Sequence, residues 1–281
     1  MNNNLIRIIP ILDIKNGLLI KGINLEGLRI LGKAKNFANY YYENGADEIC
    51  YIDNVATVYG TNNLSKFVTE TAKDVFIPLS VGGGIRSIND VEKMLLAGAD
   101  KICINSAVIE NIEFLKKASR IFGSANITVI IQSVKIEKKY YTSRSNGRDL
   151  SKINPLDWAK KVQDSGAGEI IITSVNNEGL KKGFDLELTS KLSKQISIPI
   201  IAHGGGGSFQ DIYKVIKNTN ISGVGLASFL HYDSLNYFPR FKPKIGNTEF
   251  LNSFSKSKKR RNMIFEIKKY LKSKRIKVRN G

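Results

Sequence analysis

The chain carries one strand pattern twice: residues 45–53 read GADEICYID, and residues 166–174 read GAGEIIITS, 121 positions later. A second pattern repeats with the same offset, because IPLSVGGG at 77–84 returns as IPIIAHGGGG at 198–207. Two separated motifs that share an offset indicate duplication of a whole block of strands and helices. The sequence therefore predicts two similar halves, each with a strand that runs into consecutive glycines.

Short runs rich in Ile and Val, without polar alternation, are typical of strands buried on both faces of a parallel sheet. Amphipathic stretches such as 63–73, 88–97, 155–165 and 186–194 lie between them and are expected to be helices. Eight strand–helix units in two matching halves predict a (β/α)8 TIM barrel with a two-fold internal half-barrel repeat, with functional groups at the carboxyl ends of the strands. The expected strands cover 7–12, 48–53, 76–81, 101–104, 127–132, 169–173, 199–203 and 222–226.

The length of 281 residues fits one barrel domain over 1–281. We expect no helix directly after 226–228, but a basic insert at about 233–262 and then a closing helix at 263–274. From 240 to 281 the chain has 15 Lys and Arg against two Glu. This basicity indicates either a solvated lysine-rich surface or attraction for anions.

The cysteines, the first residues and the histidines indicate the compartment of the protein and whether it binds a metal. Cys50 and Cys103 lie in apolar runs, so we expect buried, reduced thiols rather than a disulfide. Residues 1–12 lack a signal-peptide pattern, and no apolar run approaches the roughly 18 residues of a membrane span. We therefore expect a soluble cytoplasmic protein without a membrane partner. Two isolated histidines, His203 and His231, predict no metal site, and nothing in the sequence calls for a cofactor.

Glycines end the third strand at Gly82, Gly83 and Gly84, and the seventh at Gly204 and Gly205. They let the backbone approach an anion closely, and the following helix adds its positive N-terminus. Tight strand–helix turns also need glycine for steric reasons alone, but the paired occurrence favours phosphate binding at both places. The implied ligand carries a phosphate-like group at each end. Donors from Asn105, Ser106, Ala227 and Ser228, after the fourth and eighth strands, would complete the two sites, here called the first and second cradles.

Asp13 and Gln132 occupy corresponding ends of the first and fifth strands, between the two cradles. A carboxylate at the mouth of an apolar strand is suited to general acid or base work. The alternative is a structural ion pair of Asp13 with Lys15 or Lys21. Gln132 cannot transfer a proton, so this chain would keep one acid where the fold could hold two.

Four charged residues, Arg7, Glu48, Lys101 and Glu169, each begin a different strand. In a closed barrel they would converge around the axis at the amino-terminal end. Buried charges are expensive unless they are paired, so a mutual salt-bridge ring is one interpretation. The other is a gate through which a small polar molecule enters from a partner.

Several further motifs occur in one order along the chain. With these motifs the sequence resembles the HisF family, the cyclase subunit of imidazole glycerol phosphate synthase, over about 5–232. Residues 265–279 are similar to the closing helix and tail of that family. The motifs are IIPILDIK at 8–15, VGGGIR at 81–86, GADK at 98–101, INSA at 104–107, GAGEI at 166–170 and GFDLEL at 183–188.

The resemblance implies a (β/α)8 barrel that takes ammonia from a HisH-like glutaminase and uses it on a substrate with two phosphates. The products would be imidazole glycerol phosphate and an aminoimidazole carboxamide nucleotide. The four charged residues at the strand starts would be the ammonia gate, and Asp100 would contact the partner. Asp13 matches the first catalytic aspartate, and Lys21 matches a lysine in the loop after the first strand.

Departures from the family pattern fall at the active site. Gln132 replaces the second catalytic aspartate, which typically costs orders of magnitude where that proton transfer limits the rate. Residues 174–180 read SVNNEGL where histidine-pathway members read SxDRDGT, which keeps Gly179 as an expected substrate contact. Ala202 and His203 replace a small residue and a serine, and His203 is expected to hydrogen-bond substrate.

The segment VATVYGTNN at 55–63 resembles a HisF-like branch that acts in surface-sugar synthesis. Members of that branch work with a HisH-like glutaminase and a sugar amidotransferase to convert an acetamido sugar to its acetamidino form. Together with Gln132, this segment favours such a surface-polysaccharide paralogue. The alternative is a genuine imidazole glycerol phosphate synthase subunit of histidine biosynthesis. A remote third interpretation is nucleic-acid binding through Lys258–Arg261 with nearby phenylalanines.

Overall fold

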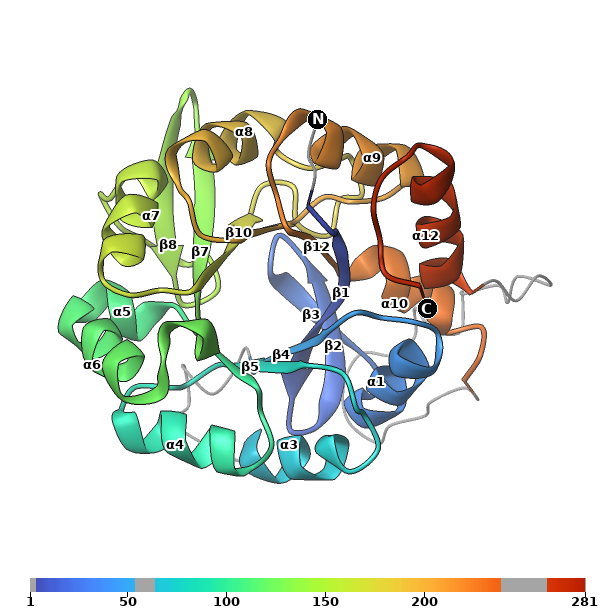
Figure 1. Ribbon diagram of the computed structural model, residues 1–281, viewed down its shortest axis with the longest axis horizontal. Helices are drawn as coiled ribbons and strands as arrows, with labels where there is room; N and C mark the ends of the chain where they lie inside the picture. The colour runs from blue at the N-terminus through green and yellow to red at the C-terminus, as the bar shows by residue number, and fades with distance from the viewer. Residues whose placement is uncertain (1–3, 54–63, 239–261, 281) are drawn as a thin grey trace.

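The computed structural model describes residues 4–53, 64–238 and 262–280. Within these ranges, eight parallel strands close into a barrel around which the helices are arranged (Figure 1). This confirms the predicted (β/α)8 fold. Pairing of β6 with β7 joins the two halves on one side, and pairing of β1 with β12 joins them on the other. The barrel strands are β1 (Arg7–Lys15), β4 (Ile49–Asp53), β5 (Leu79–Gly82), β6 (Lys101–Ile104), β7 (Ile127–Ile136), β10 (Glu169–Ser174), β11 (Ile200–His203) and β12 (Gly223–Leu226).

The helices cover the outside of the barrel and bury one apolar face each against it. In α4, for example, Val91 and Met94 are fully buried. The expected helices at 63–73, 88–97, 155–165, 186–194 and 263–274 are present to within about a residue at each end. The described helices are α1 (Ala34–Glu43), α3 (Leu64–Ala72), α4 (Ile88–Leu96), α5 (Ser106–Glu110), α6 (Ile112–Phe122), α7 (Pro155–Asp164), α8 (Leu186–Gln195), α9 (Phe209–Asn218), α10 (Ser228–Ser234) and α12 (Met263–Ser273), with a 3₁₀ turn at Ser124–Asn126.

The two halves repeat in register as well as in sequence. Asp13 of β1 pairs with Ile52 of β4, and Gln132 of β7 pairs with Thr173 of β10, 121 positions after Ile52. Asp13 and Gln132 are therefore structurally equivalent. The helix starts repeat too: the hydroxyl of Ser87 accepts from the backbone of the third residue of α4 at 3.2 Å, and Ser208 does the same for α9 at 3.1 Å.

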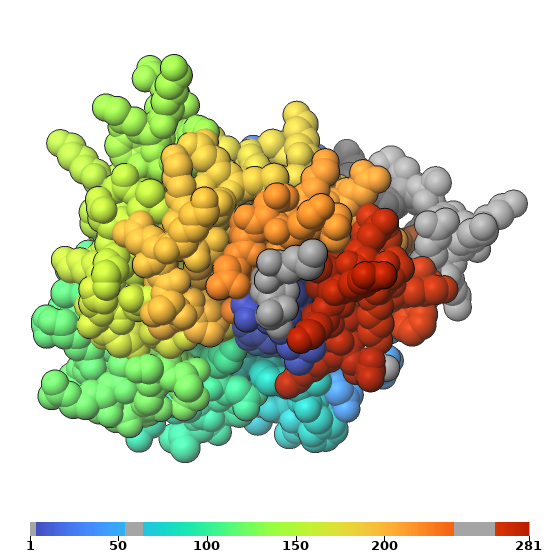
Figure 2. Space-filling view, turned by 45° about the horizontal axis from the view of Figure 1, so that its top comes forward, coloured from blue at the N-terminus to red at the C-terminus, as the bar shows by residue number. Residues whose placement is uncertain are grey.

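Each half also carries an antiparallel hairpin that the sequence analysis did not anticipate. The first consists of β2 (Leu18–Ile23) and β3 (Glu26–Lys33), after β1. The second consists of β8 (Lys139–Arg144) and β9 (Asp149–Leu150), after β7, and β8 also pairs with the extended end of β7. The yellow-green region around this hairpin projects from the body in Figure 2. Both hairpins extend from the carboxyl ends of barrel strands, where the active site of such a fold is expected.

The expectation that no helix follows 226–228 directly was wrong, because α10 begins at Ser228. It is only seven residues long, so helical periodicity is hard to detect, and a buried histidine helps to hold it. His231 Nε2 lies 2.9 Å from the carbonyl oxygen of Ile11, and Nδ1 lies 2.7 Å from the hydroxyl of Tyr41. Most of the predicted basic insert lies outside the described residues, as does the segment 55–63.

The two ends of the described chain meet at the amino-terminal side of the barrel. The backbone amide of Ile6 donates to Lys277 at 2.9 Å, and Ile6 forms a bridge with Val278, so the blue and red segments touch in Figure 2. Cys50 and Cys103 are buried and free, as expected. Within the described ranges, no helix combines the length and apolarity needed to cross a membrane.

Candidate active site

The four charged residues at the strand starts form a closed ring inside the amino-terminal end of the barrel. Arg7 Nη1 lies 2.8 Å from Glu48 Oε2, and Lys101 Nζ lies 3.2 Å from Glu48 Oε2 and 2.9 Å from Glu169 Oε2. Arg7 also contacts Glu169, and Glu48 accepts from the hydroxyl of Ser80. Burial by itself lowers the pKa of Arg7 and of Lys101, but the two carboxylates raise both on balance. The predicted convergence is therefore present; passage of ammonia through this ring stays a prediction.

An apolar layer lies inside the barrel above the ring. Its two thiols, Cys50 and Cys103, have their sulfur atoms 4.0 Å apart. A small cavity of about 20 Å³ extends from Cys50 to Asp13, Gln132 and His203 at the carboxyl-terminal mouth. Movement of a molecule from the ring to the mouth would therefore require side chains of this layer to shift. Its other members are Ile9, Ile11, Ile130, Ile171 and Ile201.

Asp13 is buried at the mouth, with 4% of its surface exposed, and its Oδ2 lies 3.5 Å from Lys21 Nζ. Lys21 is completely buried on the first hairpin and also contacts Glu178, which follows β10. Burial by itself lowers the pKa of Lys21, but Asp13 and Glu178 raise it on balance. Of the two ion pairs considered for Asp13, the structure contains the one with Lys21. This leaves Asp13 as a carboxylate held by a cation at the end of an apolar strand.

Gln132 uses its side chain to hold the second hairpin over the mouth. Its Oε1 accepts from the backbone amide of Gly147 at 3.1 Å, and its carbonyl oxygen accepts from the hydroxyl of Ser143 at 3.3 Å. The equivalent carboxylate position in the first half, Asp13, instead faces a lysine. The two positions therefore differ in partners as well as in chemistry.

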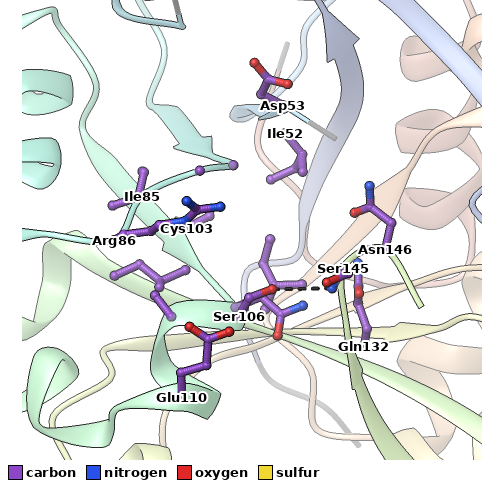
Figure 3. Close-up of a pocket in the computed structure, with 16 residues that line it drawn as sticks. Ile52, Asp53, Ile85, Arg86, Cys103, Ser106, Glu110, Gln132, Ser145 and Asn146 are labelled. Atoms are coloured by element: carbon purple, nitrogen blue, oxygen red, sulfur yellow. Dashed lines mark hydrogen bonds between the residues drawn. The ribbon is translucent and has the colours of Figure 1, made fainter. Parts of the chain in front are cut away.

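The first cradle opens into a cavity of about 400 Å³ (Figure 3). Gly83 and Gly84 have φ angles of +105° and +68°, which favour glycine, and a Cβ on Gly82 would lie 2.7 Å from the carbonyl oxygen of Cys103. The backbone here thus requires glycine at the strand end. Arg86 lies on one side of the cavity and Gln132 on the opposite side in Figure 3.

Polar groups from three segments complete the wall of the first cradle. The hydroxyl of Ser106 accepts from the backbone amide of Ser145 at 3.4 Å. Asn105 Nδ2 donates to Ser143 at 3.5 Å, while its buried Oδ1 has no partner among the described residues. The sequence analysis assigned no role to five further polar or charged residues that line this cavity. They are Asp53, Arg86, Glu110, Ser145 and Asn146.

The second cradle has the same backbone conformation as the first, but neighbouring atoms nearly fill it. Gly204 and Gly205 have φ angles of +91° and +101°, but the cavity beside them measures only about 10 Å³. The hydroxyl of Ser228, after Ala227, is buried without a partner in the described part of the chain. It remains available to a ligand. Lys181 also lines this cradle, and burial lowers the pKa of its amine although Asp233 partly opposes this.

The first hairpin covers the mouth and is bound to the segment after β10. The backbone amide of Asn24 donates to the carbonyl of Glu178 at 2.9 Å, and Asn24 Nδ2 donates to Val175 at 2.7 Å. The amide of Leu25 donates to Glu178 Oε2 at 3.2 Å, and Leu25 lines the cavity above Asp13. A Cβ on Gly179 would lie 2.7 Å from the carbonyl oxygen of Gly22, so glycine permits this close contact.

His203 ends β11 at the same mouth, with 7% of its surface exposed. Its Nδ1 lies 3.1 Å from the hydroxyl oxygen of Thr173. Burial lowers the pKa of His203 to about 4, although the charge of Asp13 opposes this shift. At neutral pH the imidazole is therefore uncharged.

Asp100 lies at the opposite end of the barrel. It is exposed, and its Oδ2 accepts from the backbone amide of Leu79 at 2.8 Å, at the start of β5. This is the end that carries the charged ring. Across the described residues, no three His, Cys, Asp or Glu side chains gather as a metal site would require.

Comparisons with known proteins agree on one family. The family described as histidine biosynthesis protein matches residues 7–236. A Legionella pneumophila protein named imidazole glycerol phosphate synthase subunit HisF is 45% identical over 207 residues, or 73% of this chain and 98% of the relative. Proteins of the same name from Bacillus cereus (strain G9842) and Sulfolobus acidocaldarius are 43% and 40% identical, over 80% and 85% of this chain and 90% and 95% of their own lengths.

Proposed function

This chain belongs to the HisF family of histidine biosynthesis proteins, and on that premise we propose that it is the cyclase-type subunit of a glutamine amidotransferase complex. In this proposal the barrel receives ammonia at its amino-terminal end and uses it on a phosphorylated substrate at its carboxyl-terminal mouth. The observation that carries the proposal is the arrangement along one axis. The charged ring, the apolar layer, Asp13 and the two cradles follow one another from end to end.

The proposed partner is a HisH-like glutaminase that docks at the amino-terminal end. The relatives are named as subunits, which supports the existence of a second subunit. The exposed carboxylate of Asp100 lies at this end, beside the ring, and would contact the partner. Passage from the ring to Asp13 crosses the isoleucine-rich layer, so the proposed route opens by movement of those side chains.

The proposed substrate is the bis-phosphate that yields imidazole glycerol phosphate. The names of the relatives support this histidine-pathway chemistry better than the surface-polysaccharide interpretation that the sequence analysis favoured. In this reaction the two cradles hold the two phosphates, the second after the side chains that narrow it have moved, and Asp13 acts as acid or base beside the bound substrate. Lys21 pairs with Asp13 in the absence of substrate and would hold its carboxylate at the mouth.

One observation favours a second candidate, the paralogue that serves acetamidino-sugar synthesis with a sugar amidotransferase. Gln132 cannot transfer a proton, and its amide oxygen is already used by Gly147. A subunit that only receives and conducts ammonia would not need a second acid at this position. The Tyr59 segment that also suggested this branch lies outside the described residues.

The test is direct turnover of the histidine-pathway substrate. The purified chain is supplied with an ammonium salt and the bis-phosphate, and release of the aminoimidazole carboxamide nucleotide is followed. Turnover that disappears in Asp13→Asn is expected. A correctly folded wild-type protein that binds the bis-phosphate but releases no product would reject the cyclase and leave the second candidate.

The proposed gate is tested by Lys101→Ala in the complex with the glutaminase from the same organism. Glutamine-dependent turnover should fall severalfold, whereas turnover with added ammonium salt should stay the same, because delivery is disturbed but chemistry is not. Lys116→Ala is the matched control, since that lysine forms only an exposed pair with Glu113. Equal effects of Lys101→Ala on both nitrogen sources would contradict the gate.

A further inference from the structure

His203 stands where the first half of the barrel has glycine. Residues 203 and 82 are equivalent under the offset of 121, and both end a strand before a glycine cradle. We propose that His203 is a catalytic proton-transfer residue, which performs with Asp13 the acid–base work that Gln132 cannot perform. The inference rests on the proposed ammonia-using function and assigns the second proton carrier of that same site.

The sheet register places His203 level with Gln132. Thr173 pairs with Gln132 on one side and with His203 on the other, so the three residues form one row across β7, β10 and β11. Gln132, His203 and Asp13 also line one cavity at the mouth. A reacting group bound there would lie within reach of either position in the row.

The strand beside His203 has glycine at the paired position. Gly225 pairs with His203 on β12, and a Cβ on Gly225 would lie 2.5 Å from Ile11 Cδ1 and 3.3 Å from His203 Cβ. In the first half the arrangement is reversed, because the glycine is Gly82 and its neighbour across the sheet is Cys103. The last strand residue before the cradle is therefore a titratable histidine in the second half and a glycine in the first.

The hydrogen bonding of His203 orients its ring toward the cavity. Thr173 occupies Nδ1, whereas Nε2 has no hydrogen-bond partner among the described residues. When Nδ1 carries the proton and donates to Thr173, the lone pair of Nε2 is available to a ligand. Because burial lowers the pKa of His203 to about 4, the ring is neutral at pH 7 and can accept a proton.

Charged and titratable groups approach this ring from several elements. Asp13 comes from β1 and opposes the lowered pKa of His203, while Lys21 from the first hairpin adds to it. The remaining neighbours are Glu178 and Lys181 from the segment after β10, which line the same cradle, and His231 from α10. Ligand phosphate in this cradle would bring further negative charge and raise the pKa of His203 toward neutrality.

The proposed step conserves atoms and charge. The nitrogen of ammonia forms a bond to an electrophilic carbon of the acceptor, and the leaving atom departs with the electron pair of its bond to that carbon. The proton released by the nitrogen passes to Nε2 of His203. The imidazolium then gives this proton to the leaving atom, so that His203 ends the cycle in its neutral form.

A variant pair distinguishes proton transfer from a structural role. His203→Ser should lower ammonium-dependent turnover of the bis-phosphate by about 10²–10⁴-fold at saturating substrate. Adding Gln132→Asp should restore at least about tenfold of that loss, because it places a carboxylate in the same row. If His203 only packs or holds Thr173, Gln132→Asp should raise turnover by the same factor with His203 or with Ser at position 203, whereas proton transfer by His203 predicts a larger factor with Ser.

Two further measurements keep the inference testable if His203→Ser folds poorly. His203→Gln keeps a hydrogen-bonding side chain of similar length but cannot carry a proton, and should lose the acidic limb of the rate–pH profile. With only two histidines in the chain, ring NMR signals can be assigned by this variant. A protonated His203 at pH 7, turnover within about threefold of wild type in His203→Gln, or no gain from Gln132→Asp would overturn the assignment. A wild-type protein without ammonium-dependent turnover would instead reject the proposed function, and the inference with it.

Discussion

The two half-barrels share a backbone but present different sites. The first cradle opens into about 400 Å³, whereas the second leaves about 10 Å³. Arg86 in the first half corresponds to Gly207 in the second, where a Cβ would lie 2.4 Å from the carbonyl oxygen of Lys181. The cap serines and the left-handed glycines are retained in both halves. Duplication has therefore preserved what the backbone requires, while the side chains that meet a ligand have diverged.

The largest expected difference is in the turnover of variants at the equivalent positions 13 and 132. Asp13→Asn should reduce ammonium-dependent turnover by about 10²–10⁴-fold, because it replaces the carboxylate of Asp13 with an amide that cannot carry a proton. Gln132→Asn should change it by less than about tenfold, since neither amide transfers protons. Steady-state kinetics with circular dichroism as a folding control measures both. Equal losses in the two variants would mean that the halves have not diverged in chemistry.

Acid should lower the stability of the protein through its second half, which contains both histidines of the chain. Burial lowers the pKa of His203 to about 4 and that of His231 to about 3, below the unfolded value. The unfolded state thus binds more protons between pH 6.5 and 4, so the free energy of unfolding falls on acidification, on the order of several kcal/mol. Denaturant titrations at pH 6.5 and 4.5 measure this. The difference should shrink in His203→Gln, and an unchanged difference would contradict the attribution.

Because the two halves share a backbone conformation, equivalent glycines should lose equal free energy of unfolding when replaced by alanine. Gly83→Ala and Gly204→Ala should each lower the free energy of unfolding by about 2 kcal/mol, because both residues have positive φ angles and face a neighbouring carbonyl. Gly27→Ala is the control, since φ there is also positive but no atom lies within 4 Å of a Cβ, and should cost about 1 kcal/mol. A large difference between the first two variants would show that the cradles are not held alike.

The smallest effect concerns the helix starts. Ser87→Ala and Ser208→Ala should each cost about 1 kcal/mol, because each removes the acceptor for a backbone amide at the start of a helix. Thermal unfolding of the two variants beside wild type measures the shifts. Shifts that differ by more than twofold would show that the caps of α4 and α9 contribute unequally.

The sequence alone predicted the barrel because its signals are local and repeated. Apolar runs, the offset of 121 and paired glycines each depend on a few consecutive residues. Strand ends were predicted to within a few residues, and Asp13, Gln132 and the two cradles do meet at one end of the barrel. The charged ring followed from the same logic, since equivalent strand starts must converge when the sheet closes.

What the sequence could not predict depends on contacts between distant segments. Lys21 and Glu178 are 157 positions apart, and only the folded hairpin brings them together. Two of the hairpin strands, β3 and β8, contain many polar residues and resemble loops in composition, so the pairing of the hairpins was not anticipated. The short helix α10 depends on His231 reaching Tyr41 and Ile11, which no local pattern reveals.

The ring at the amino-terminal end has redundant bonding. Each of its carboxylates contacts both cations, so withdrawal of either cation leaves neither carboxylate bare. An unpaired buried charge would cost several kcal/mol, and the doubled contacts reduce that penalty when one cation moves. If Lys101, with its flexible stem, swung aside, Arg7 alone would still contact both acids. The proposed gate would therefore open at Lys101 while the other three side chains stay in contact with one another.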